Sequence, residues 1–550
     1  MNYLLFIVSI FISHLTVTIL AYILFFNSFN LAAPFLFIYD LVRPVITAIR
    51  YKKIVTPYFE YSLHFTLLYL GIIFLPFLCS VKNDKKGKYG YARFITCRRT
   101  IKQMGFNFES GIVFGKLKNN IIKRLFTRKS YDVIRSNEPL STLMIAPTGA
   151  GKTAGFIIPA LESVKNSLVV FDIKGELYKL THKKRQEMGH KILKLDPEDF
   201  KNSIKFNPFA VNQLPEKIML PSYISNISNI IFAKKGDDRN DYFTNSTKDF
   251  FNTVALFLIY KKGYTTINEI KSLVVKDNDL ATTFKQIQEE LKEELEVIKD
   301  DLEQKIINKI SEGIKRMVQI IEAKDQFSGV IGSFNTKLSL FNDFDIENIT
   351  DCKKSTITAE ALRQENITLY LSVKDNDIER LNPLISLFFE SLTSDLISKE
   401  PSKYHNQVTF ILDEFGNLGR VKKLIKATTI SRSYKLNQIF VLQDLKQLSH
   451  IYSPEEKEIL EANTAYKIIL AQNNFETAKH ISQMIGNKTE TRSSESENKG
   501  KGNKSKSISK SDEGISLVTA QDIMNLDRNE CLILTQRNYA KVINPYISWI

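Results

Sequence analysis

The chain has 550 residues, of which 43% are hydrophobic and 25% charged, so it is long enough for two or three domains with large cores. Its four cysteines, Cys79, Cys97, Cys352 and Cys531, form no CxxC pair and no metal-ligand spacing, which argues against a disulfide framework and a cysteine zinc site. The net charge of +15 indicates an acidic partner such as nucleic acid or anionic lipid.

Two uncharged, apolar runs near the N-terminus are each long enough to cross a membrane. No Asp, Glu, Lys or Arg occurs from Tyr3 to Phe26 or from Tyr61 to Ser80, and each run reaches the ~20 residues that span a bilayer as a helix. The first run is too long for the apolar core of a secretory signal peptide, and it does not begin with basic residues. The sequence therefore predicts a retained anchor over residues 1–80, with spans at about 3–26 and 61–80.

The charge pattern beside the second run predicts its orientation. Basic residues dominate "KNDKKGKYGYARFITCRR", and a Lys/Arg excess next to a span marks the cytoplasmic side. We therefore expect residues 27–60 on the far side of the membrane, a juxtamembrane segment over 81–135 and a cytoplasmic location for the rest. Basic residues beside a membrane contact lipid head groups whatever the protein does, so the net charge alone does not establish a nucleic-acid partner.

The cytoplasmic part has the pattern of an α/β fold. Three continuous apolar runs each end in a turn, in "TLMIAPTGAGKT", "SLVVFDIKGEL" and "QVTFILDEFGNL", and such runs are typical of a parallel sheet covered by helices on both faces. This predicts a nucleotide-binding domain over 136–215 and 331–550. Apolar residues at three and four spacing predict an all-α insertion over 216–330, and a Ser, Lys and Gly rich stretch predicts a disordered loop over 490–514.

The stretch "APTGAGKT" resembles a phosphate-binding loop, although Ala146 stands where glycine is usual. In such a loop the glycines turn backbone N–H groups toward phosphates, the lysine reaches the terminal phosphates and the next hydroxyl ligates Mg²⁺. Ala146 precedes Pro147, which holds it in an extended conformation where a Cβ carries no steric penalty. The candidate nucleotide-binding residues are Thr148, Gly149, Ala150, Gly151, Lys152 and Thr153.

A dinucleotide-binding fold is an alternative for the same stretch. Gly149, Gly151 and Gly155 form a loose glycine triplet, and Asp172 follows about twenty residues later, as a ribose-binding acid would. This alternative does not explain why Lys152 and Thr153 follow Gly151. It also leaves a second acidic site, in "FILDEFGNLG", unexplained.

That second acidic site favours an NTPase. After its apolar strand, Asp413 is expected to hold Mg²⁺ together with Thr153, and Glu414 to act as the general base that polarises the attacking water. A helix N-cap is the structural alternative for the two acids. The phosphate loop and the acidic pair need each other chemically, so we expect Lys152 and Glu414 to meet in one site.

Two further residues are weaker candidates. Gln443 ends the apolar strand "QIFVLQD" and is a candidate sensor of the γ-phosphate, although a strand-end glutamine is often an ordinary surface residue. Arg432, in "ISRSY", is a candidate arginine finger for a neighbouring subunit's nucleotide, because arginine offers a planar and permanently charged fork to transition-state oxygens. A surface salt bridge explains Arg432 equally well.

A series of motifs in fixed order resembles one protein family. "APTGAGKT" looks like its Walker A, "VVFDIKGELY" like its Asp-x-Lys-Gly-Glu segment and "FILDEFGNLG" like its Walker B. "FNPF", "SGVIGSFNTKLSLF", "ISRSYKLNQIFVLQDLKQL" and "ANTAYKIILAQNNFETAKHISQMIGNKT" also look like segments of the family. On these motifs the chain is similar to the type IV secretion coupling ATPases, the TraG and VirD class of conjugation motor.

The resemblance implies a RecA-like motor domain with an inserted all-α domain, anchored by two helices in the bacterial inner or plasma membrane and assembled as a homo-hexamer. It implies ATP and Mg²⁺ as cofactors. The implied partners are a relaxase–DNA complex, protein effectors or both, together with type IV secretion channel subunits. Two other functions stay open: a membrane receptor that binds nucleotide without hydrolysing it, and a DNA-pumping or segregation ATPase, in which we see no match to "FDIKGELY".

Overall fold

The computed structural model describes residues 88–119, 130–233, 241–275, 279–500, 503–536, 539 and 541–543. All of them lie in the second of two structural units, Gly87–Ile550. The predicted membrane spans and the stretch between them lie outside the described residues. Among the helices that are described, none combines the length and apolar character needed to cross a bilayer.

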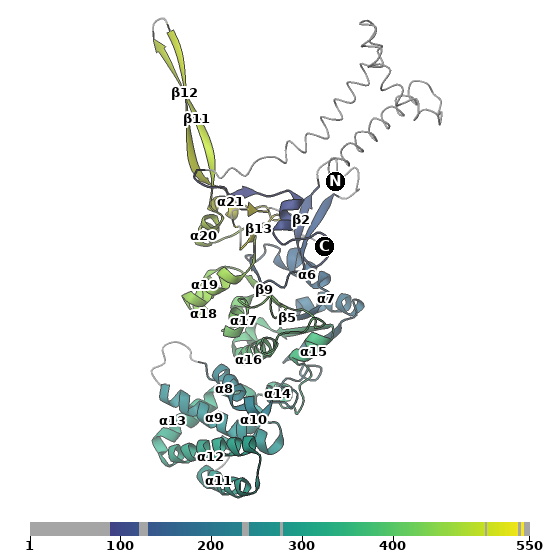
Figure 1. Ribbon diagram of the computed structural model, residues 1–550, viewed down its shortest axis with the longest axis vertical. Helices are drawn as coiled ribbons and strands as arrows, with labels where there is room; N and C mark the ends of the chain where they lie inside the picture. Colours follow the sequence, from purple (N-terminus) through teal and green to yellow (C-terminus); the bar gives the residue numbers. More distant parts are fainter. Residues whose placement is uncertain are drawn as a thin grey trace, which may run out of the picture. The chain divides into compact units, whose positions relative to one another are not determined.

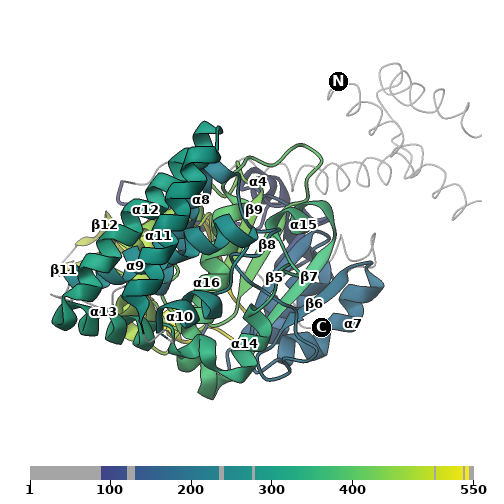
Figure 2. The same cartoon turned by 90° about the horizontal axis from the view of Figure 1, so that it is seen from below.

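An eight-stranded sheet forms the centre of the described fold (Figure 1; Figure 2). In spatial order its strands are β13 (Leu532–Thr535), β10 (Tyr466–Ile469), β4 (Thr142–Ile145), β9 (Leu436–Leu442), β8 (Val408–Leu412), β5 (Ser167–Ile173), β7 (Ile367–Val373) and β6 (Lys191–Leu195). Seven strands run parallel, and β13 pairs with β10 in the antiparallel direction. The predicted α/β class is confirmed, but the sheet is mixed and not wholly parallel.

The apolar runs form strands because both faces of the sheet are covered. Every residue of β5, β7, β8 and β9 is buried. Alternate residues of β5 enter different cores, with Val169 and Phe171 on one face and Leu168 and Val170 on the other. Strand residues alternate between faces, so a strand that is buried on both sides reads as a continuous apolar run.

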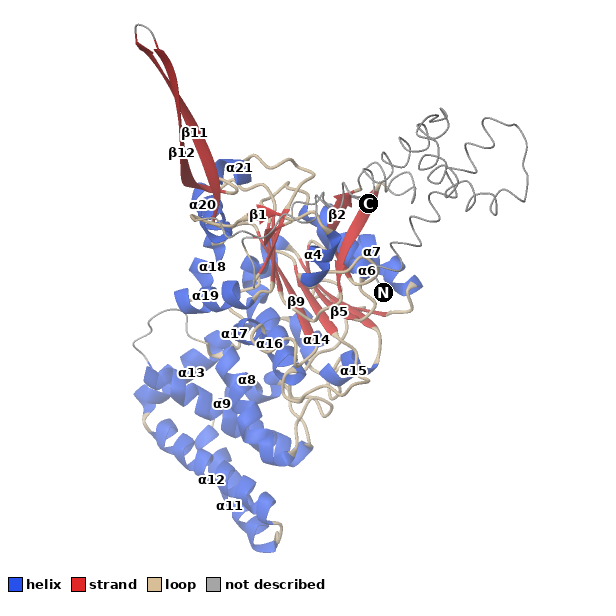
Figure 3. Ribbon diagram, turned by 45° about the horizontal axis from the view of Figure 1, so that its top comes forward, coloured by secondary structure: helices blue, strands red, loops and turns tan. Residues whose placement is uncertain are grey.

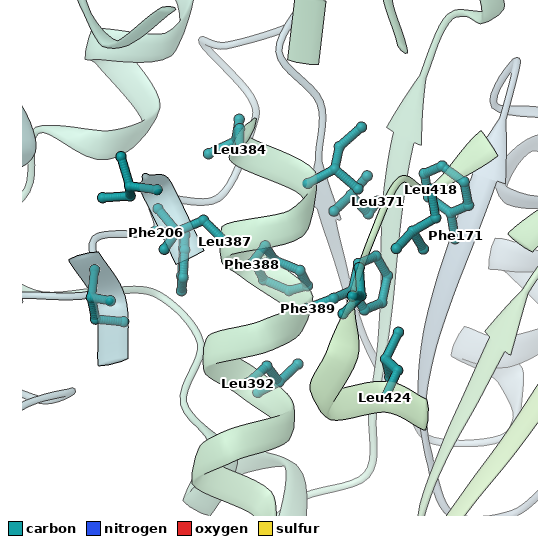
Figure 4. Packing of buried hydrophobic residues seen from close by; sticks show 14 of the residues in the cluster. Phe171, Phe206, Leu371, Leu384, Leu387, Phe388, Phe389, Leu392, Leu418 and Leu424 are labelled. Atoms are coloured by element: carbon teal, nitrogen blue, oxygen red, sulfur yellow. The ribbon is translucent and has the colours of Figure 1, made fainter. Parts of the chain in front are cut away.

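Helix α16 (Ile378–Leu396) covers one face of the sheet (Figure 4). The ring of Phe389 meets that of Phe171 edge to face, with 6.1 Å between centroids, and Phe388 meets Phe206 in the same way at 5.0 Å. Such arrangements are favoured because the positive edge of one ring lies against the negative face of the next. One side of α16 therefore packs on the sheet, and its other side packs on the segment that leads into the helical region.

Arg185 joins the helices on the opposite face. It belongs to α7 (Glu176–Glu187) and is fully buried, and its guanidinium donates to the carbonyl oxygens of Leu161, Val164 and Asn166 at the end of α6 (Ile158–Ser163). Burial lowers the pKa of Arg185 to about 10, which leaves it charged at neutral pH. The π-helix η1 (Thr153–Ile157) begins at the phosphate loop and continues into α6, so this helical segment is held at its far end by α7.

A group of helices between β6 and β7 lies apart from the strands (Figure 3). Its main members are α8 (Leu220–Ile231), α9 (Asp241–Lys262), α10 (Ile267–Val275), α11 (Leu280–Val297), α12 (Asp301–Glu322), α13 (Lys324–Lys337) and α14 (Phe344–Thr350). The short helices η2 (Lys217–Met219) and η3 (Ser339–Asn342) complete it. The described helices continue about twenty residues beyond 330, the predicted end of the insertion.

The segment predicted as juxtamembrane packs on the nucleotide-binding domain where it is described. It contains β1 (Arg93–Phe94), α4 (Arg98–Gln103), β2 (Ile112–Lys118) and β3 (Tyr131–Ser136). Phe114 of β2 lies 5.9 Å from Phe156 and 5.1 Å from Tyr466, ring centroid to centroid. β1 pairs in parallel with β14 (Lys541–Val542), so the two ends of the described chain meet. This part of 81–135 therefore shares the core of the domain and is no separate linker.

Where the structure describes the stretch predicted as a disordered loop over 490–514, its residues form strands instead. β11 (Asn487–Gly500) and β12 (Asn503–Ser516) form a two-stranded antiparallel ribbon that extends from the rest of the domain (Figure 1). Composition indicated disorder because few apolar side chains are present, but cross-strand polar pairs also support a hairpin. Near its base, Thr491 donates to Asp512 at 2.7 Å and Arg492 pairs with Glu513 at 3.2 Å.

The remaining helices connect the sheet strands. They are α15 (Ala359–Gln364), η4 (Asp375–Asp377), η5 (Phe415–Asn417), α17 (Lys422–Ala427), α18 (Lys446–Ile451), α19 (Pro454–Asn463), α20 (Phe475–Ile485) and α21 (Ala520–Met524). The carboxyl ends of the parallel strands meet at one edge of the sheet, and the predicted site residues follow β4, β8 and β9 there.

Candidate nucleotide-binding site

The loop after β4 has the backbone expected of a phosphate-binding loop. Gly149 and Gly151 have φ of 79° and 84°, a region that glycine enters without steric cost. Ala146 is fully buried, and its N–H donates to the carbonyl oxygen of Leu442 at 2.8 Å. Ala146 therefore extends the pairing of β4 with β9, and its methyl group fits in the core. Glycine is needed later in the loop, at the two positions with positive φ.

Four of the predicted catalytic and metal-binding residues meet at the carboxyl edge of the sheet. Lys152 Nζ lies 3.2 Å from Glu414 Oε1 and 3.5 Å from Asp413 Oδ1. Gln443 Nε2 donates to Glu414 Oε1 at 3.2 Å. Because β4, β9 and β8 are adjacent in the sheet, the residues that directly follow these strands become neighbours. Lys152 and Glu414 meet in this way although 262 positions separate them in sequence. The expected meeting of Lys152 with the acidic pair is thus present.

The backbone at Glu414 is unusual for a residue other than glycine. Its φ of 57° and ψ of 51° place it in the left-handed region, and such strain occurs where the surrounding structure fixes a functional side chain. Asn417 Nδ2 donates to Glu414 Oε2 at 3.1 Å, so both carboxylate oxygens are oriented. The short helix η5 that follows receives no side-chain capping bond from Glu414. Glu414 thus stands at the N-cap position of η5, but its side chain is directed to Lys152, Gln443 and Asn417 and does not cap the helix.

The residues present suit Mg²⁺ beside a nucleotide's phosphates. The Asp413 side chain is 13% exposed, and its Oδ1, which lies 3.5 Å from Lys152 Nζ, accepts no hydrogen bond within the described part of the chain. Burial raises the pKa of Asp413, and the charge of Lys152 opposes this shift. A carboxylate oxygen in this position can accept a hydrogen bond from metal-bound water, and hydroxyl and carboxylate oxygens are ligands that Mg²⁺ prefers. Thr153, directly after Lys152, stays the predicted source of the hydroxyl ligand.

Asp172 has a structural role that excludes the ribose-binding one. Its carboxylate accepts backbone N–H bonds from Leu177 at 3.1 Å and Tyr178 at 2.8 Å, in the first turn of α7. Burial and the nearby charge of Asp413 raise the pKa of Asp172 to about 6, although the two N–H bonds work in the opposite direction. The side chain is fully buried. The dinucleotide alternative therefore loses its acidic residue.

The raised pKa of Asp172 predicts a pH-dependent stability. The folded protein binds this proton more tightly than the unfolded chain does, so ionisation of the buried carboxyl destabilises the fold as the pH rises from about 4 to about 6. Asp172→Asn removes this component, and we expect its Tm relative to the unmodified protein to improve between pH 4.5 and pH 7. Thermal melts at both pH values measure it, with Asp375→Asn at an exposed carboxylate as control. A difference in Tm that is the same at both pH values would contradict the prediction.

Arg432 does not join the site within one subunit. It precedes β9, whereas Gln443 follows it, so the two lie at opposite edges of the sheet. The Arg432 side chain is 69% exposed and lies 3.4 Å from Glu138 Oε2. The salt-bridge alternative is thus present, and a role toward a neighbouring subunit stays a prediction.

The structure adds residues that the motif analysis gave no role. A pocket of about 520 Å³ opens beside the loop and is lined by Pro147, Thr148, Gln443, Asp444, Asn473, Asn474 and Phe475. The last three follow β10, which lies next to β4 in the sheet. The segment "NNFETAKH" resembles a segment of the family, but no rule of residue spacing predicts that it lies near the phosphate loop. Its proximity to the loop depends on strand order.

The fold and the site together define a class of protein. A glycine-rich loop joins β4 to a helix, and an acidic pair ends a strand separated from β4 by β9. This is the arrangement of a RecA-like P-loop NTPase fold. A model of the type IV secretory system conjugative DNA transfer family matches residues 99–544. The chain therefore belongs to this family.

Curated relatives agree with the family. The chain is 29% identical to Protein VirD4 of Rhizobium radiobacter over 410 residues, which cover 73% of this chain and 56% of that protein. It is 27% identical to Protein VirD4 of Agrobacterium fabrum over 457 residues, which cover 82% of this chain and 64% of the relative. Conjugal transfer protein TraG of Escherichia coli is 23% identical over 369 residues, with 65% and 57% covered. The matches thus span less than two thirds of each relative.

Solved structures show the same fold at low identity. The plasmid coupling protein TrwB in complex with the ATP analogue ADPNP has a TM-score of 0.59 and 14% identity, and the match covers 85% of this chain and 96% of that one. TrwB in complex with ADP and Mg²⁺ has a TM-score of 0.54 and 15% identity, with 80% and 94% covered. These likenesses cover 80% or more of this chain, so they support the RecA-like fold of the described domain.

Proposed function

We propose that the chain is a membrane-anchored, Mg²⁺-dependent ATPase that couples relaxase–DNA complexes, protein effectors or both to a type IV secretion or conjugation channel. The observation that carries the proposal is the convergence of Lys152, Asp413, Glu414 and Gln443 at one edge of the sheet. The family to which the chain belongs supports the transport role. The nucleotide and Mg²⁺ complexes of TrwB support the choice of cofactors.

The proposal gives each of these residues a role. Lys152 and the loop N–H groups between Thr148 and Thr153 would bind the phosphates, and Thr153 with Asp413 would hold Mg²⁺, which when bound supplies positive charge to the phosphates. When phosphates take over Lys152, Glu414 is released from its ion pair and can accept the proton of the attacking water. Gln443, already bonded to Glu414 Oε1, orients that carboxylate and links it to β9.

The proposed location rests on the charge pattern of the sequence, and the proposed assembly rests on the resemblance to the family. The uncharged runs at 3–26 and 61–80 supply the anchor in a bacterial inner or plasma membrane, and the basic residues after position 81 place the motor in the cytoplasm. A homo-hexamer gives Arg432 a neighbouring nucleotide to reach, since its exposed side chain lies away from the site of its own subunit. The proposed partners are the ones that the family implies: type IV secretion channel subunits, and a relaxase–DNA complex, protein effectors or both as cargo.

The proposal is tested on the full-length protein in detergent by measuring ATP binding and hydrolysis, with and without DNA, while its oligomeric state is recorded. We expect Lys152→Ala to abolish ATP binding and hydrolysis together, because the phosphates lose their main positive charge. Lys285→Ala, at an exposed lysine of the helical region, is the control.

Arg432→Ala is expected to keep ATP binding and to slow ATP hydrolysis in the assembled form only. Hydrolysis that survives Lys152→Ala refutes the ATPase, and binding without hydrolysis by the unmodified protein favours the receptor.

A further inference from the structure

Phe475 is an exposed aromatic residue beside the phosphate loop. It is the first residue of α20 and is 51% exposed, whereas the largest buried side chains of the described domain include ten other phenylalanines. Together with Pro147, Thr148 and Asn473 it lines the pocket of about 520 Å³. That volume is within the roughly 300–1,000 Å³ typical of small-ligand pockets. An apolar ring is thus presented to solvent where a ligand of the loop would lie.

The position of Phe475 is fixed by its neighbours. Asn474 Nδ2 donates to Asp444 Oδ2 at 2.6 Å, and Thr477 Oγ1 donates to Asp444 Oδ1 at 2.7 Å. The backbone N–H of Lys446 donates to the same Oδ1 at 2.9 Å. Asp444 directly follows Gln443, so these bonds tie the start of α20 to the end of β9. The exposure of Phe475 therefore belongs to an ordered element whose orientation is set from within the site.

The polar side chains that line the pocket, Asp444 and Asn473, suit a flat and uncharged portion of a ligand. The carboxylate of Asp444 is already occupied by three donors, and despite its burial these hydrogen bonds hold its pKa below the ordinary value. Asn473 is exposed, and among the described residues its side chain forms no hydrogen bond. An amide can both donate and accept, so it can pair with the edge of more than one heterocycle.

We propose that this pocket binds the base of the nucleotide, with Phe475 as its stacking surface and the Asn473 amide at the base edge. The inference rests on the proposed function, because it places a base next to phosphates held by residues 148–153. Stacking on an aromatic ring depends on the area of the base more than on its hydrogen-bonding pattern. The subsite therefore prefers purines to pyrimidines and discriminates weakly between adenine and guanine.

The test compares ligands with and without a base on the full-length protein in detergent. Calorimetry with Mg²⁺ measures the Kd of ATP, GTP, CTP and inorganic tripolyphosphate. We expect Phe475→Ala to weaken ATP and GTP binding by about 5- to 150-fold and to leave tripolyphosphate binding unchanged. Phe475→Leu keeps an apolar side chain but lacks a ring, so it is expected to behave like Phe475→Ala. Tyr404→Ala, at an aromatic residue that is 92% exposed, is the control.

A spectroscopic variant provides an independent readout. The chain has a single natural tryptophan, Trp549. Phe475→Trp keeps a stacking surface, and we expect it to retain ATP affinity and to gain a fluorescence signal that ATP changes and tripolyphosphate does not. The same signal in both ligands would show that the residue senses the loop and not the base.

The outcomes separate this inference from the proposed function. If the unmodified protein binds neither ATP nor tripolyphosphate, the proposed function fails and the base subsite fails with it. If both bind with equal affinity, or if Phe475→Ala leaves ATP affinity unchanged, only the base subsite is refuted. If Phe475→Ala weakens ATP and tripolyphosphate equally, Phe475 supports the loop and binds no base. Loss of hexamers without loss of ATP affinity makes it a subunit contact instead.

Discussion

Glu414→Gln is expected to lower the rate of ATP hydrolysis by about 10² to 10⁴, because the variant has no general base for the attacking water. ATP binding is expected to persist, since Lys152 and the loop N–H groups are unchanged. Lys152 also loses its contact at 3.2 Å with a charged Glu414 oxygen, which removes a competitor of the phosphates. The variant should therefore accumulate in the ATP-bound form.

Single-turnover hydrolysis and equilibrium ATP binding, measured on the same full-length preparation, test this expectation. Glu322→Gln makes the same change at a carboxylate of α12 that is 57% exposed, and it should leave both quantities unchanged. Hydrolysis by Glu414→Gln at a rate close to that of the unmodified protein would remove Glu414 from its role as base. Equal loss of binding and hydrolysis would indicate that the carboxylate mainly maintains the structure of the site.

Arg185→Ala is expected to destabilise the domain by about 3–5 kcal/mol, because it removes the donor of several buried hydrogen bonds to neutral groups. The change leaves the carbonyl oxygens of Leu161, Val164 and Asn166 without their donor, and each unsatisfied buried group costs about 1–3 kcal/mol. It also breaks the bond from Arg185 Nε to Thr368 Oγ1 at 2.9 Å, which links α7 to β7.

Thermal melts of the full-length protein measure the effect as a lower apparent Tm. Arg316→Ala removes a guanidinium whose side chain is 54% exposed and is expected to change stability by no more than about 0.5 kcal/mol. Arg185→Lys keeps a positive charge but offers fewer donors, so its Tm should fall between those of Arg185→Ala and the unmodified protein. A melt of Arg185→Ala that matches the unmodified protein would show that water replaces the lost donors.

The central site is predictable from the sequence because its functional residues lie in short local motifs. Lys152 follows one buried strand and Asp413 and Glu414 follow another, and carboxyl ends of parallel strands share an edge. Gln443 could be named for the same reason. Motif order also predicted the family. These inferences need only local patterns and the rule that parallel strands are aligned.

The rest depended on contacts that no local pattern specifies. Phe475 lies at the loop because Tyr466 of β10 pairs with Thr142 of β4, more than 300 residues away in sequence. Nothing in the sequence of β13 shows that it runs antiparallel to β10. Arg432 and Gln443 are close in sequence, yet the seven residues of β9 separate them by about 23 Å. The hairpin at 487–516 was missed because polar composition does not distinguish a solvated ribbon from a disordered chain.

The pairing of β1 with β14 sets the boundaries of a fragment that retains all the strand pairs of the described domain. Arg93 and Phe94 pair with Lys541 and Val542, and the N–H of Ile95 donates to the Val542 carbonyl oxygen at 2.7 Å. The match to the family begins only at residue 99. A protein trimmed to that boundary lacks the partner strand of its own C-terminal segment, although every motif is still present. Truncation experiments on this family member should therefore begin before β1, with both ends of the pair retained.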